Sequence, residues 1–193
     1  MEAAHIADDV HAVVLVEGLS DRVAIEALAE RRGRDLAAEG VSVVPIGGAQ
    51  AIRRALDLYG PPGLGLALAG LCDVGEERSF RRGLEHAGLG TELSRDAMER
   101  LGFYVCEADL EDELIRAVGA DRVQDVVAAQ GELETFRNFQ NQLFWREKPV
   151  EAQLRRWLQN GGRYLRYPPL LVEALEPNEI PRPLVGVLTA AAS

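Results

Sequence analysis

Four short apolar runs, each followed by a turn and then by apolar residues at helical spacing, constrain the fold of this chain most. The runs cover residues 11–16, 41–46, 64–71 and 102–105. Nearly continuous runs of β-branched and aliphatic residues are typical of strands buried on both faces, as in a parallel sheet. Helical patterns follow them through about Arg32, Tyr59, His86 and Val118. This alternation predicts an α/β fold with a doubly wound, four-stranded parallel sheet.

The pattern becomes purely helical beyond residue 120. Residues 123–144 predict one long helix or two, and residues 150–159 and 164–175 predict two more, separated by glycines. Pro181-Arg182-Pro183 opens a last short helix. No linker is long enough to make this part independent. We therefore expect an α/β domain over residues 1–119 and a helical extension over residues 120–193 that packs on it.

The charge of the chain restricts the classes of partner. The formal net charge is −10, whereas contacts to nucleic-acid phosphates come from Lys and Arg. Two features offset this: a metal site carries an excess of carboxylates when empty, and the stretch Arg155–Arg166 holds four arginines and no acid. Acidity therefore weakens the case for nucleic-acid binding without excluding it.

The sequence also indicates the compartment. No run of about 18 apolar residues predicts a membrane span, and residues 1–5 lack the start of a secretory signal. The two cysteines, Cys72 and Cys106, fit neither a disulfide framework nor a zinc site, and each closes an apolar run as a small buried residue would. We expect a cytoplasmic protein.

Acidic residues follow three of the four predicted strands. Glu17 follows the first strand, Asp73 the third, and Glu107 and Asp109 the fourth. Open parallel sheets bind ligands outside the carboxyl ends of their strands, and carboxylate oxygens are ligands that Mg²⁺ prefers. The sequence therefore predicts a divalent-metal site at this edge of the sheet. Its candidate ligands are Glu17, Asp21, Asp73, Glu76, Glu77, Asp109 and Glu111.

Several of these acids have a plain structural alternative at the start of a helix. Glu76 and Glu77 would open a helix, where the dipole favours acids. Asp109 is a natural N-cap with Asp112 three residues on. Ser20 is the expected N-cap of the first helix. Position alone leaves both interpretations open.

The motifs around the acids resemble one family. Residues 16–21, Val-Glu-Gly-Leu-Ser-Asp, resemble the signature glutamate turn of TOPRIM domains. That family ends its third strand with a second acidic motif, usually Asp-x-Asp; Asp73 matches its first aspartate, and Gly75 departs from its second. The segments 46–48 and 109–114 are most similar to the TOPRIM type of the overcoming-lysogenization-defect (OLD) proteins. The resemblance covers about residues 11–118.

The resemblance implies a Mg²⁺- or Mn²⁺-dependent DNA endonuclease with two metal ions. Glu17 and Asp73 would be catalytic and would hold the ions with Asp21 and one or two of the remaining candidate acids. OLD-type nucleases resemble one another in a basic residue near the scissile phosphate, for which we select Arg163, preceded by two glycines. No Walker A pattern appears, so we expect the ATPase half of OLD proteins to be missing or separately encoded.

Several alternatives stay open at this point. A TOPRIM module that binds metal or phosphate without cleaving, as the partner of a separate ATPase, fits the Gly75 departure. A receiver-like domain phosphorylated on Asp73 fits poorly, because it lacks paired acids after the first strand and a lysine after the last. Arg163 also fits a surface position, and Trp157, Tyr164 and Tyr167 either stack on bases or anchor helices. Monomer and homo-oligomer both remain open.

Overall fold

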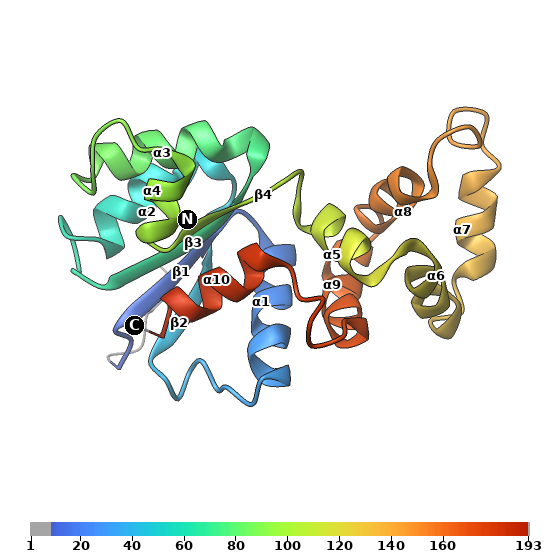
Figure 1. Ribbon diagram of the computed structural model, residues 1–193, viewed down its shortest axis with the longest axis horizontal. Helices are drawn as coiled ribbons and strands as arrows, with labels where there is room; N and C mark the ends of the chain where they lie inside the picture. The colour runs from blue at the N-terminus through green and yellow to red at the C-terminus, as the bar shows by residue number, and fades with distance from the viewer. Residues whose placement is uncertain (1–8, 193) are drawn as a thin grey trace.

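A computed structural model of the protein describes residues 9–192; the N-terminal segment without a signal pattern lies outside them. Four parallel strands form one sheet in the order β2-β1-β3-β4. They are β1 (Ala12–Val16), β2 (Val41–Pro45), β3 (Ala67–Asp73) and β4 (Phe103–Cys106). The predicted four-stranded α/β fold is confirmed (Figure 1).

The chain runs from β1 to one edge of the sheet and then returns across β1 to the other edge. The strand order therefore reverses between β1 and β3, and the carboxyl ends of these two neighbours bound the crevice in which open α/β sheets bind ligands. The register pairs Val16 with Pro45, so β1 and β2 end at the same level, and with Leu71, so β3 extends two residues beyond β1.

Helices cover both faces of the sheet. One face packs against α2 (Ile52–Tyr59), α3 (Glu77–His86) and the short α4 (Arg95–Arg100), which the sequence analysis did not predict. The other face packs against α1 (Leu19–Arg31) and α10 (Arg182–Ala190). Two short 3-10 turns, η1 (Ala49–Ala51) and η2 (Val74–Glu76), precede α2 and α3.

The remaining helices extend away from the sheet beyond α1 (Figure 1). They are α5 (Leu110–Val118), α6 (Ala120–Ala129), α7 (Leu133–Gln140), α8 (Val150–Leu158) and α9 (Arg163–Ala174). Residues 123–144 thus contain parts of two helices, because Gly131 adopts a left-handed φ of 71° that ends α6. One continuous apolar cluster joins the sheet, α1 and this helical part.

The third strand begins later than the apolar pattern predicts. Residues 64–66 bond back to the end of α2: the N–H of Leu64 donates to the Leu58 carbonyl at 2.9 Å, and that of Leu66 to Tyr59 at 2.8 Å. These backbone groups are therefore not available to the sheet, and β3 runs two residues further than predicted, to end on Asp73 itself. No helix within residues 9–192 has the length and apolar character that a membrane crossing requires.

Candidate metal site

Glu17 connects the ends of three strands. It leaves β1, and its Oε1 accepts a hydrogen bond of 2.8 Å from the backbone N–H of Asp73 at the end of β3. Its own carbonyl accepts from the N–H groups of Gly47 and Gly48 after β2, at 3.1 and 3.0 Å. Both glycines have positive φ, of 77° and 103°, which few other residues tolerate. Burial raises the pKa of Glu17, opposed by the Asp73 N–H and reinforced by Glu76.

Asp21 is fixed by the first turn of α1. Its Oδ2 accepts from the N–H of Gly18 at 2.8 Å, and its side chain is buried. Gly18, in extended conformation, is therefore the N-cap; the expectation that Ser20 caps this helix is wrong, because Asp21 bonds back and starts the helix at Leu19. Burial, followed by repulsion from Glu111, Glu17 and Asp109, raises the pKa of Asp21 to about 7.

Asp73 is the last residue of β3 and is only partly exposed. Within residues 9–192 its carboxylate has no hydrogen-bond or ion-pair partner. Burial and the nearby carboxylates, Glu17 first, raise the pKa of Asp73 to about 8. A carboxylate that is desolvated, unpaired and surrounded by like charge is stabilised by a bound cation.

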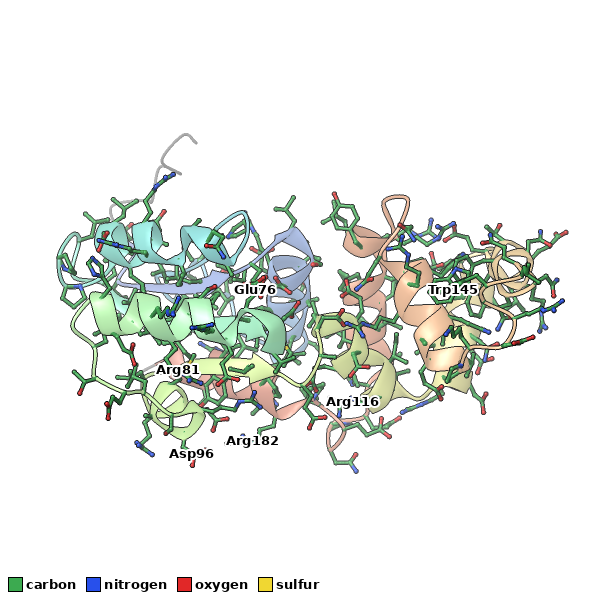
Figure 2. The ribbon with its side chains drawn as sticks, turned by 90° about the horizontal axis from the view of Figure 1, so that it is seen from above. Glu76, Arg81, Asp96, Arg116, Trp145 and Arg182 are labelled. Carbon is green, nitrogen blue, oxygen red and sulfur yellow. The ribbon has the colours of Figure 1, made fainter. Side chains whose placement is uncertain are left out.

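The two glutamates after Asp73 have different environments. Glu76 accepts a hydrogen bond of 3.3 Å from the Ser79 hydroxyl and lies close enough to Glu17 to raise its pKa. Figure 2 shows Glu76 at the end of the α/β part that faces the helical part. Glu77 instead lies between Arg95 and Arg81, whose guanidinium groups lower its pKa. The structure thus leaves Glu77 neutralised by two arginines.

Asp109 and Glu111 enter the site from the start of α5, and both are buried. Asp109 caps this helix through an N–H bond from Asp112 at 2.9 Å. Its other oxygen accepts from Arg155 Nε at 2.7 Å and from Gln159 at 2.8 Å. Burial and Asp109 raise the pKa of Glu111. Asp109 therefore caps α5 with one oxygen, while the other oxygen binds side chains of α8 and its end.

Arg155 of α8 is the cation that the structure brings to these acids, and the sequence analysis did not select it. It also interacts electrostatically with Asp112 and Glu111, and its side chain is 40% exposed. The acid-free basic stretch that begins at Arg155 was the signal for it. Nothing in the sequence distinguished it from the other arginines of that stretch.

Arg163 is engaged elsewhere. It pairs with Glu132 at 3.1 Å, and its guanidinium lies 3.9 Å from the centre of the Trp157 ring. Glu132 also accepts hydrogen bonds from Arg166 and from the buried Tyr167. These contacts hold the start of α9 against the corner between α6 and α7. Trp157 and Tyr167 pack edge to face at 5.6 Å inside the core, so they anchor helices.

Five carboxylates thus interact at the carboxyl edge of the sheet: Glu17, Asp21, Asp73, Asp109 and Glu111. Within residues 9–192 no three Asp, Glu, His or Cys side chains already form a complete ligand set for one ion. Mg²⁺ keeps several waters and takes one or two carboxylates together with substrate phosphate. The hard oxygen donors present fit such an ion. Both cysteines are buried, which raises the pKa of their thiols.

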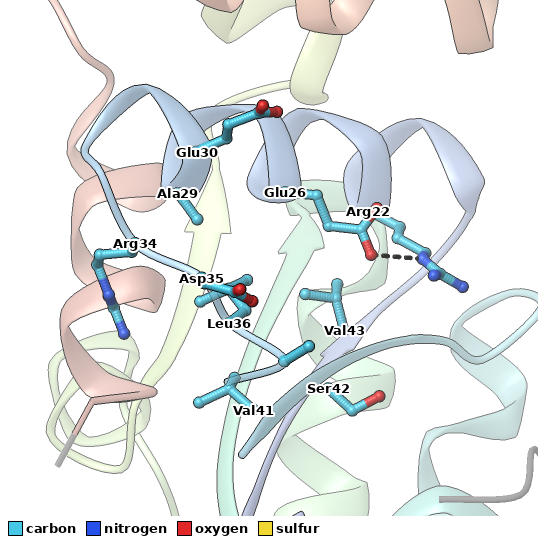
Figure 3. Close-up of a pocket in the computed structure, with 11 residues that line it drawn as sticks. Arg22, Glu26, Ala29, Glu30, Arg34, Asp35, Leu36, Val41, Ser42 and Val43 are labelled. Atoms are coloured by element: carbon cyan, nitrogen blue, oxygen red, sulfur yellow. Dashed lines mark hydrogen bonds and ion pairs between the residues drawn. The ribbon is translucent and has the colours of Figure 1, made fainter. Parts of the chain in front are cut away.

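A cavity of about 490 Å³ lies away from these acids, between α1 and the edge strand β2 (Figure 3). Its floor is apolar, with Val41 and Val43, and its rim carries mixed charges such as the Arg22–Glu26 pair at 2.8 Å. The acids that line it, Glu26, Glu30 and Asp35, belong to α1 and the loop after it and lie away from the carboxyl edge of the sheet.

Comparison with known proteins agrees with this geometry. Residues 10–74 match the family model for the TOPRIM domain of overcoming lysogenization defect protein-like sequences. The C-terminal region of the Xanthomonas campestris pv. campestris OLD protein has a similar structure, with a TM-score of 0.75 and 26% identity over 95% of this chain and 92% of that one. The C-terminal region of the Burkholderia pseudomallei OLD protein gives 0.73 and 21%, over 95% and 97%. No curated protein matches the chain in sequence.

Proposed function

We propose that this chain, which carries an OLD-like TOPRIM domain, is a Mg²⁺- or Mn²⁺-dependent DNA endonuclease that hydrolyses phosphodiester bonds. The observation that carries the proposal is the cluster of acids at the switch point of the sheet, where burial first, and then repulsion from Glu17 and the other acids, raises the pKa of Asp73 to about 8. Such perturbed groups in a crevice are typical of functional sites.

The acids of the candidate site would have different roles in metal binding. Asp73 is the unpaired carboxylate and Glu17 is held against it by the 2.8 Å bond to its N–H, so these two would be the central metal ligands. Asp21, Asp109 and Glu111 are the other carboxylates that act electrostatically on Asp73. Bound divalent ions, which we propose to be two, supply a Lewis acid and an activated water.

Arg155 is the basic residue that we now favour near the substrate phosphate, in place of Arg163. It holds Asp109 in position through two bonds of 2.7 and 2.6 Å. Its exposed fraction of 40% leaves donors free for an anion. Arg163 is only 18% exposed and already pairs with Glu132.

Cleavage of supercoiled plasmid tests the proposal. Wild type, Glu17→Gln and Asp73→Asn are compared in Mg²⁺, Mn²⁺, Ca²⁺ and EDTA. We expect metal-dependent nicking or linearisation by wild type and a loss of at least ~100-fold in each variant, since each removes a metal ligand. Glu26→Gln is the control, because this half-buried acid on α1 pairs with Arg22 and such pairs near the surface contribute little.

Two results would count against an endonuclease. Wild-type rates in either site variant would show that the acids are not catalytic. Absence of cleavage in every metal, with metal binding retained by calorimetry, would instead support the non-catalytic module that partners a separate ATPase.

A further inference from the structure

A second charged feature lies beside the acids, in a groove of about 440 Å³ between η1–α2 and α3. Three arginines line it, Arg53 from α2 and Arg78 and Arg82 from α3, together with His86. All four side chains are exposed. The side chains of these three arginines have no ion-pair or hydrogen-bond partner among residues 9–192. By contrast, the arginines near the candidate acids, such as Arg81, Arg95 and Arg155, are paired with carboxylates.

The spacing of these groups suits an extended anion. Arg78, Arg82 and His86 stand at intervals of four residues on one side of α3, so they repeat about every 6 Å and span roughly 12 Å. A single phosphate is too small to contact all of them. A nucleic-acid strand advances about 3.4 Å per phosphate along the helix axis, so it offers three to four phosphates over that length.

Close packing of the two helices forms the floor of the groove. A Cβ atom on Gly83 of α3 would stand 3.1 Å from Ile52 and 3.2 Å from Leu56 of α2, so a larger residue would require these side chains to shift. Gln50 and Ser79 face one another across the groove, 3.5 Å apart. Glu76, which precedes α3, accepts a hydrogen bond from the Ser79 hydroxyl.

Both walls of the groove begin at the metal site. The turn η1 follows Gly48, whose N–H bonds the Glu17 carbonyl, and η2 follows Asp73 directly. A nucleic-acid strand that lies along α3 would therefore reach the acids at the carboxyl edge of the sheet.

We propose that the groove of Arg53, Arg78 and Arg82 binds the phosphate backbone of DNA and leads it to the site of Glu17 and Asp73. The inference rests on the proposed function, which makes DNA the substrate. It also offers a way for an acidic protein to hold a polyanion, because three arginines without acidic partners stand together in one groove.

The test is the salt dependence of DNA binding. Affinity of the full chain for a fluorescent 30-base-pair duplex is measured by anisotropy from 50 to 300 mM KCl, in Ca²⁺ and in EDTA, so that binding is separated from cleavage. Each phosphate contact contributes about 0.9 to the slope of log K against log salt. We expect R53Q/R78Q/R82Q to lower the slope by about 2 to 3 and to weaken binding at least ~10-fold at 100 mM salt.

The matched control is R32Q/R100Q/R137Q, which removes the same charge at exposed arginines outside the groove. An unchanged slope in the control supports the groove; equal slopes in the two triple variants, or no duplex binding by wild type, would overturn it. A single charge reversal, Arg82→Glu, repeats the test in case the triple variant loses its fold by circular dichroism. Competition by inorganic phosphate separates the two sources of phosphate: full displacement at low millimolar phosphate, with no change in slope, would indicate a single-phosphate site and overturn the proposal.

Failure of the two proposals is distinguishable. Cleavage with equal slopes refutes only the groove, and a lowered slope without cleavage in any metal refutes only the endonuclease.

Discussion

At the scale of single residues, Asp73 makes the sharpest prediction about stability. Its pKa is raised from 3.8 to about 8 in the folded protein, first by burial. Between these values the folded state binds more protons at this group than the unfolded state, so metal-free stability falls as pH rises through this window. Asp73→Asn removes the charge. We expect the variant to exceed wild type at pH 8 by at least ~1 kcal/mol, about 2–4 °C in Tm, with little difference at pH 4.

Thermal unfolding in EDTA at the two pH values measures this effect. Asp57→Asn, an exposed acid on α2, is the control. A difference between Asp73→Asn and wild type that is equal at pH 4 and pH 8 would contradict the assignment of electrostatic strain to Asp73. Saturating Mg²⁺ should raise the Tm of wild type at pH 8 more than it raises the Tm of the variant.

The sequence allowed the acids that the fold brings together to be selected, but it did not allow their partners to be selected. Glu17, Asp21 and Asp73 could be selected because each follows a strand or opens its helix, which is local information. The partners are distant: Arg95 is 18 residues from Glu77, Glu132 is 31 from Arg163, and Arg155 is 46 from Asp109. Which arginine neutralises which acid therefore depends on tertiary packing.

At the scale of elements, the alternation of strand and helix was predictable because strands buried on both faces need continuous apolar runs. Their bounds were not, as β3 shows: the backbone of Leu64 and Leu66 bonds to the end of α2 although their side chains continue the apolar run. Helix α4 was missed because it is short, Arg95–Arg100, with a single buried residue, Met98.

The centre of β3 makes a prediction about packing. Gly70 pairs with Phe103 of β4, and a Cβ on Gly70 would stand 2.5 Å from the Phe103 ring, which is 1% exposed, and 3.0 Å from the Leu15 carbonyl. Gly70→Ala should therefore destabilise the protein by about 1–3 kcal/mol through overpacking, although alanine costs less chain entropy. Gly75→Ala, where nothing lies within 4 Å, is the matched control. Urea unfolding measures the stability of both variants. Equal unfolding midpoints would show that β3 and β4 accommodate the added methyl group without loss of stability.

At the scale of the whole molecule, the helical part completes the core of the sheet. Ile25 and Leu28 of α1 are fully buried in the apolar cluster to which α9 contributes Leu171 and Val172 and α10 contributes Leu184. Arg31 donates to carbonyls at the end of α9, and Arg34 donates to that of Leu188 in α10 at 2.7 Å. The division into residues 1–119 and 120–193 follows the sequence pattern, yet the two parts share this cluster.

A fragment of residues 1–119 should therefore fail to fold alone. Each large apolar side chain that it uncovers costs about 1.5–3 kcal/mol, and a few of them equal the whole stability of a typical domain, about 5–15 kcal/mol. We expect the full chain to unfold in one calorimetric transition, and the fragment to show none and to bind a hydrophobic dye. Co-expression with residues 120–193 should restore the transition, because the second fragment supplies α9 and α10. A cooperative transition of the first fragment alone, near the Tm of the full chain, would show instead that the α/β part is an independent domain.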